Sequence, residues 1–152
     1  MFEQAISAMA SVMVDPYLLG LIFATTVLGV IIGVLPGLGA TTGAALLLPF
    51  TLTMDPVHAI AVLATIYVSA TFAGSITAIL INTPGTSAAA ATTFDGYPLA
   101  QKGEAGRALG IAVISSTVGG IFSVLILCFA APLLARVAYE FRSPEYFALT
   151  VF

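Results

Sequence analysis

The chain has 152 residues, of which 60% are hydrophobic and only 7% are charged, whereas soluble domains contain about 25% charged residues. Together with a mean hydropathy of +1.13, this composition excludes an ordinary water-soluble domain. Seven acidic and four basic residues give a net charge of −3 and leave no basic surface for nucleic acid. Cys128 is the single cysteine of the sequence, so an intrachain disulfide cannot form.

Charged residues are absent from three long stretches, which lie between Asp15 and Asp55, between Asp55 and Asp95, and between Arg107 and Arg136. A bilayer core needs about 20 apolar helical residues to be crossed, and each stretch is longer. Lipid offers the backbone no hydrogen-bond partner, so only helices or closed barrels span it, and continuous rather than alternating hydrophobicity favours helices. We therefore predict an all-α, polytopic integral membrane protein that is embedded in the lipid bilayer.

Residues 1–15 form the first predicted element. Apolar side chains recur there at helical spacing. The segment contains no Lys or Arg, so it lacks the positively charged start of a signal peptide. We predict a short amphipathic helix over residues 1–15, which lies at the membrane surface or docks on a neighbouring part of the protein. A transmembrane domain over residues 16–152 follows it.

Three helices are predicted to begin where a capping side chain precedes a proline, because proline is favoured at the first helical position. These starts are Asp15-Pro16, Asp55-Pro56 and Ser143-Pro144. The three long transmembrane helices are expected over residues 16–35, 56–81 and 106–134. The segment after residue 144 is too short to cross a bilayer, so we interpret it as the start of a further span in a longer protein.

Two stretches between these spans interrupt an apolar run with a Pro-Gly pair, Pro36-Gly37 and Pro84-Gly85. Proline removes a backbone hydrogen bond and glycine permits a turn. The segment over residues 40–53 would extend about 21 Å as a helix, which is short of a full crossing, and the hydroxyl-rich segment after Pro84 is shorter still. We predict two broken or re-entrant helical segments, with loops at the membrane surface as the alternative.

Broken helices form binding sites in transporters, because half-helix N-termini attract anionic groups and freed carbonyls and hydroxyls can hold a coupling cation. Thr83 is predicted to cap a half-helix that starts at Pro84, which would leave the N–H groups of Gly85, Thr86 and Ser87 free for a carboxylate. The predicted substrate-binding residues are, in order of preference, Asn82, Thr83, Gly85, Thr86 and Ser87, then Gly37, Gly39, Thr41 and Thr42, with Pro36 and Pro84 as helix breakers.

The sequence contains no cluster of nucleophile, general-base or metal-binding residues within the predicted spans. We therefore expect neither an enzyme nor a cofactor, with Na⁺ or H⁺ as the coupling ion of a transporter. Gly29 and Gly33 have the four-residue spacing of closely packed membrane helices. His58 is interpreted as a solvated side chain at a helix start, with a proton relay as the alternative, and residues 95–104 as a solvated loop.

Four segments form a longer pattern: residues 33–39 (GVLPGLG), 82–87 (NTPGTS), 94–98 (FDGYP) and 102–110 (KGEAGRALG). The pattern resembles the large membrane subunit of the tripartite tricarboxylate transporters, and the likeness extends from about Gly20 onward. It implies a multi-pass permease subunit of the bacterial inner membrane, which works with a small membrane subunit and a periplasmic solute-binding protein. The binding protein would capture citrate or a similar small carboxylate, and an ion gradient would drive its import.

Two other classes of function stay open at this point. One is an integral membrane scaffold or docking subunit that does not transport, in which the Pro-Gly stretches are surface loops that bind a partner. The other is a channel, whose flux would neither saturate nor depend on an ion gradient.

Overall fold

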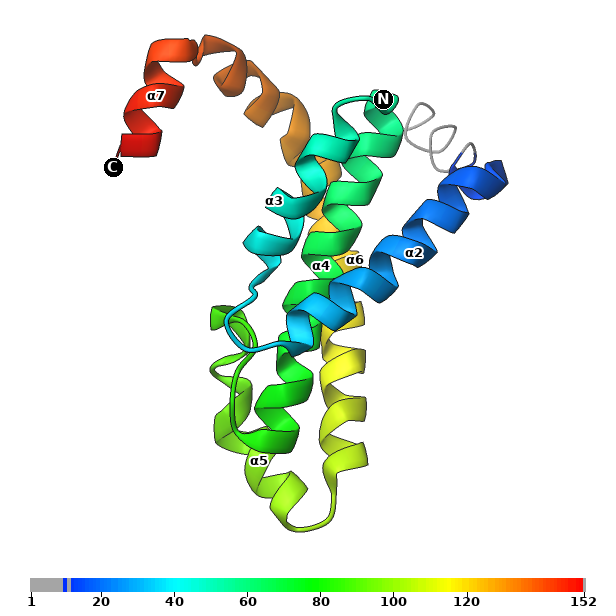
Figure 1. Ribbon diagram of the computed structural model, residues 1–152, viewed down its shortest axis with the longest axis vertical. Coiled ribbons are helices and arrows are strands. Elements are labelled where there is room, and N and C mark those ends of the chain that lie inside the picture. Colours follow the sequence, from blue (N-terminus) through cyan, green and yellow to red (C-terminus); the bar gives the residue numbers. More distant parts are fainter. Residues whose placement is uncertain (1–9, 11, 152) are drawn as a thin grey trace. The chain divides into compact units, whose positions relative to one another are not determined.

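The computed structural model describes residues 10 and 12–151 (Figure 1). These residues form helices and connecting turns, with no strand among them, which confirms the all-α class. The chain divides into two compact units, Met1–Ile114 and Ser115–Phe152. The predicted amphipathic helix over residues 1–15 lies almost entirely outside the described residues and stays a prediction.

Six α-helices and one short 3₁₀ helix are described. They are α2 (Pro16–Val34), α3 (Ala40–Thr51), α4 (Pro56–Ile81), η1 (Ser87–Ala89), α5 (Thr92–Gln101), α6 (Ala105–Glu140) and α7 (Ser143–Val151). By length and composition, α2, α4 and the part of α6 over Ala105–Arg136 could each cross a membrane, whereas α3 is apolar but shorter. The three long helices are thus confirmed, although α6 continues past Pro132 instead of ending near residue 134.

The predicted Asp-Pro starts of α2 and α4 are confirmed. The Asp15 side chain accepts hydrogen bonds from the N–H groups of Tyr17 (2.9 Å) and Leu18 (3.2 Å). The Asp55 side chain accepts one from the N–H of Val57 (3.2 Å). Each carboxylate therefore satisfies N–H groups that have no partner within the helix itself.

Helices α2 and α4 pack side by side and run in the same direction. At their N-terminal ends, Asp15 lies 3.2 Å from His58. Further along, Gly29 lies against Ser69, and a Cβ on Gly33 would overlap the carbonyl oxygen of Ala70 and stand 2.7 Å from its Cα. The glycines thus let the two backbones approach closely, which confirms the predicted packing role.

The chain reverses between α2 and α3. The N–H of Leu38 donates to the carbonyl of Leu35 (3.1 Å), and Gly37 has a φ of +93°. Proline followed by a glycine with positive φ is the signature of a type II turn. Helix α3 then packs against α4, with Gly43 in contact with Ile32 and Ile66. Helices α2 and α3 form a helical hairpin that opens toward the N-terminal end of α4 (Figure 1).

A second hairpin starts at the other end of α4. Asn82 ends this helix in the left-handed conformation, with a φ of 56°. The chain then doubles back along α4, where the N–H of Gly85 donates to the carbonyl of Gly74 (3.3 Å). Helix α5 runs back out, with Gly96 against Ile79, and Figure 1 shows the loop climbing beside α4 before α5 descends.

The prediction of a solvated loop over residues 95–104 was wrong, because most of this segment belongs to α5. Gly96 and Pro98 are turn-forming residues in isolation. Here the packing of Gly96 on α4 overrides that local preference.

The unit Ser115–Phe152 holds the rest of α6 and all of α7. Its large hydrophobic side chains include Ile121, Phe122 and Phe129, and these three are exposed. A helix that is apolar on all sides is typical of a lipid-exposed or protein-covered span.

Candidate functional site

The loop of the second hairpin meets the end of α2 beside α4. We call residues 35–39 the first tip and residues 84–87 the second tip. A Cβ on Gly85 would overlap the carbonyl oxygen of Gly33 and lie 3.0 Å from the Cα of Gly74. Three glycines from α2, α4 and the second tip are therefore in backbone contact, and we call this group the glycine junction.

The glycine junction lies well inside the length of α4. This helix has 26 residues, so it is about 39 Å long. Gly33 packs on Ala70 and Gly85 on Gly74, which places both contacts at least about 10 Å from either end of α4. Both chain interruptions thus lie beside the inner part of a span-length helix, which favours the broken-helix interpretation over surface loops.

The first tip leads into the N-terminus of α3, a helix of 12 residues. Its N-cap is Gly39, with φ −74° and ψ 172°, and no side chain caps it by a hydrogen bond. The first N–H groups of a helix have no partner within it and carry the positive end of the helix dipole. Thr41 and Thr42 are exposed in this first turn, so two hydroxyls stand next to the uncapped N–H groups.

The predicted half-helix at the second tip was wrong. Thr83 does not cap a helix, because its hydroxyl donates to the carbonyl of Ile81 (3.3 Å). Only the three-residue η1 follows at Ser87, and the next α-helix, α5, begins at Thr92. The N–H of Gly85 is not free, since it donates to Gly74. The Pro84-Gly85 pair instead allows the chain to turn back and lie against α4.

The structure separates the predicted site residues into two groups. Asn82 and Thr83 are exposed at the base of the second hairpin, beyond the last turn of α4. Seven other predicted residues belong to the tips or to the first turn of α3, namely Gly37, Gly39, Thr41, Thr42, Gly85, Thr86 and Ser87. Gly85 is buried, whereas Ser87 is exposed.

Thr86 has a packing role in the second tip. Its hydroxyl donates to the carbonyl of Thr71 in α4 (3.3 Å), and its side chain is half-buried. A Cβ on Gly74 would lie 2.5 Å from the Thr86 hydroxyl oxygen. Gly74 was missed by sequence reasoning; the available signal was the run of small residues in α4, Ser69, Ala70, Ala73 and Gly74.

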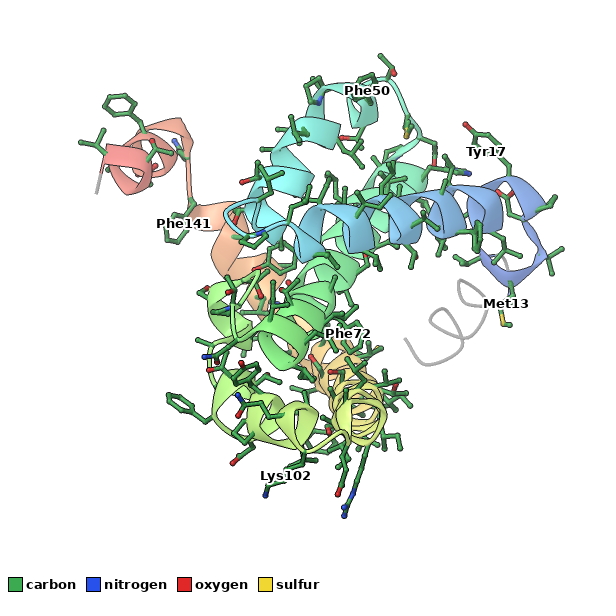
Figure 2. The ribbon with its side chains drawn as sticks, turned by 60° about the horizontal axis from the view of Figure 1, so that its bottom comes forward. Met13, Tyr17, Phe50, Phe72, Lys102 and Phe141 are labelled. Carbon is green, nitrogen blue, oxygen red and sulfur yellow. The ribbon has the colours of Figure 1, made fainter. Side chains whose placement is uncertain are left out.

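No Lys, Arg, Asp or Glu lies in the tips or in the first turn of α3. Lys102, the nearest basic residue along the chain, lies at the turn after α5 and points away from the protein in Figure 2. An anion held at the tips would therefore rest on backbone N–H groups and hydroxyls, as at other helix N-termini.

Comparison with known proteins gives two matches. Residues 19–152 match the family described as "Tripartite tricarboxylate transporter TctA family". The chain is also 50% identical over 129 residues to an Agrobacterium vitis protein named "Uncharacterized 52.8 kDa protein in TAR-I ttuC' 3'region". That alignment covers 85% of the chain but 26% of the relative, so the chain spans about a quarter of the relative's length. No solved structure matches significantly.

Proposed function

Because the chain belongs to the tripartite tricarboxylate transporter TctA family, we propose that it contributes to the membrane permease of a binding-protein-dependent secondary transporter. The permease lies in the bacterial inner membrane and imports tricarboxylates or related small carboxylates. A small membrane subunit and a periplasmic solute-binding protein are its partners, and a gradient of Na⁺ or H⁺ drives it.

The observation that carries this proposal is the contact of the second tip with the end of α2, just before the first tip, beside the inner part of α4. Discontinuous helices that meet within the membrane are where secondary transporters hold substrate and coupling ion. The uncapped N-terminus of α3 is the part of this arrangement suited to an anion. The substrate-binding group we propose is therefore led by Gly39, Thr41 and Thr42, and we add Ser87, which is exposed in the second tip.

Charge balance links the substrate to the coupling ion. A helix N-terminus offers about half an elementary positive charge, whereas a tricarboxylate carries up to about three negative charges above its pKa values. The first turn of α3 holds no basic side chain. Cations or protons that enter with the substrate supply the missing positive charge, which makes transport dependent on their gradient.

Uptake of labelled citrate tests the proposal. The natural gene product is reconstituted with its two partner subunits, and Na⁺ and H⁺ gradients are imposed in turn. Thr41→Val and Thr42→Val each remove one hydroxyl at nearly constant volume. A hydrogen bond to a charged group is worth about 1.5–3 kcal/mol, so each variant is expected to raise the apparent KM by about tenfold or more.

Thr53→Val is the matched control, because Thr53 is an exposed threonine beyond the opposite end of α3, and its variant should transport normally. Normal uptake by the Thr41 and Thr42 variants would contradict the proposed binding group. Flux that neither saturates nor follows a gradient would indicate a channel. Absence of uptake in the complete, correctly inserted assembly would favour a scaffold.

A further inference from the structure

A second polar group lies at the other end of the α2–α4 pair, away from the tips. His58, in the first turn of α4, is 22% exposed and stands between two carboxylates. Its Nε2 lies 3.2 Å from Asp15 Oδ2, and its Nδ1 lies 3.5 Å from Asp55 Oδ2. The ring of Tyr17 packs against the imidazole with a centroid distance of 5.6 Å. The sequence-based interpretation of His58 as merely solvated was therefore wrong.

Neither neutral form of the imidazole suits this position. A neutral imidazole has one N–H and one lone pair, whereas the protonated ring has two N–H groups. If Nε2 carries the hydrogen, the lone pair of Nδ1 faces the Asp55 carboxylate; in the other tautomer, the lone pair of Nε2 faces Asp15. Nδ1 is buried and has no hydrogen-bond partner among the described residues. When a second proton binds the ring, both nitrogens carry a hydrogen, and each carboxylate then faces an N–H group.

Hydrogen bonds favour the ionised form of Asp15. The N–H of Leu18 holds the pKa of Asp15 below its ordinary value of 3.8 and, with the hydrogen bonds from Tyr17 and His58, outweighs the opposing effect of desolvation. The titratable groups facing His58 from the described helices are Asp15 and Tyr17 at the start of α2 and Asp55 at the start of α4. Helix α3 has no titratable side chain.

We propose that His58 binds a proton between Asp15 and Asp55 and that this proton clamps the N-terminal ends of α2 and α4 together. The site differs from the hairpin tips in position and in ligand. Each carboxylate has two roles, since it caps its own helix and faces the shared imidazole. The clamp tightens as the pH falls, because the bound proton gives each ring nitrogen an N–H beside a carboxylate, and it loosens as the pH rises.

Thermal unfolding of the natural gene product in detergent tests the clamp, with Tm measured by circular dichroism. The wild-type Tm is expected to be higher at about pH 5.5 than at about pH 8. His58→Gln keeps one N–H donor but cannot be protonated, so this increment should disappear. Asp15→Asn and Asp55→Asn keep the helix cap, because Asn caps as well as Asp, and each should reduce the increment.

Glu104→Gln is the matched control. Glu104 is an exposed carboxylate that pairs with Arg107 at 2.8 Å, so its removal should leave the pH-dependent increment unchanged. An increment of wild-type size in His58→Gln, or in both Asn variants, would overturn the proposal. If His58→Gln does not fold, the two Asn variants decide the outcome. The readout is unfolding, so failure of citrate uptake would leave this result standing.

Discussion

At the scale of single residues, glycines fix how the helices meet. Gly29 and Gly33 have four-residue spacing, and this spacing alone predicted their packing role. The contact of Gly33 with Gly85 had no comparable signal, because it depends on where two separate turns direct the chain. At Gly33 and Gly85, backbone oxygens and Cα atoms occupy the places where side chains would otherwise stand, so these two positions tolerate no added atom without a backbone shift.

Gly33→Ala tests this packing. The new methyl group would overlap the carbonyl of Ala70, so the variant is expected to lose about 1–3 kcal/mol of unfolding free energy through overpacking. Gly20→Ala is the control in the same helix, because nothing lies within 4 Å of that position. It should be neutral or gain up to about 1 kcal/mol. Equal stability of the two variants, measured by equilibrium unfolding in detergent, would show that α2 does not approach α4 so closely.

At the scale of helices and turns, the residues at which helices begin were more predictable than the direction that the chain takes after a turn. The Asp-Pro pairs located the starts of α2 and α4, because capping acts within a few residues and is visible in the sequence. A Pro-Gly pair shows that a helix is interrupted, but not which way the chain continues. After Pro36-Gly37 a helix follows almost at once, whereas after Pro84-Gly85 the chain first packs along α4. Because an α-helix N-terminus follows the first tip and not the second, the anion site is proposed at the first tip.

Gly37→Ala tests the turn of the first tip. Gly37 has a φ of +93°, and an L-residue in the left-handed region costs roughly 1–2 kcal/mol, so the variant should lose about that much stability. Gly39→Ser is the neighbouring control, since Gly39 has an ordinary φ of −74° and open space around it. Serine is also a good N-cap, so its Tm should not fall. A Gly37→Ala variant with the wild-type Tm would contradict the type II turn.

At the scale of the whole molecule, the family was evident from the sequence, whereas the contact between the second tip and the end of α2 was not. The pattern over residues 33–39 and 82–110 predicted the transporter family to which the chain belongs. The two hairpins enter from opposite ends of α4, and their contact joins residues about fifty positions apart. Hydrophobic periodicity describes each segment separately, so it contains no information on such long-range contacts.

This arrangement predicts which turns share a side of the membrane. Val14 and Thr53 lie beside the N-termini of α2 and α4, whereas Lys102 follows α5 beyond the other end of α4. In a Cys128→Ala background, Val14→Cys and Thr53→Cys should react with a membrane-impermeant maleimide from one side only, and Lys102→Cys from the opposite side. Labelling of Thr53→Cys and Lys102→Cys from the same side would contradict the spanning orientation of α4.

The direct backbone contact in the glycine junction has a mechanical consequence. Side chains between two segments can absorb a displacement by changing rotamer, but no side chain separates Gly33 from Gly85. A shift of the α2 end toward the second tip would therefore meet the backbone of Gly85 directly. The positions of the two interruptions are therefore coupled through backbone atoms, with no adjustable side chain between them.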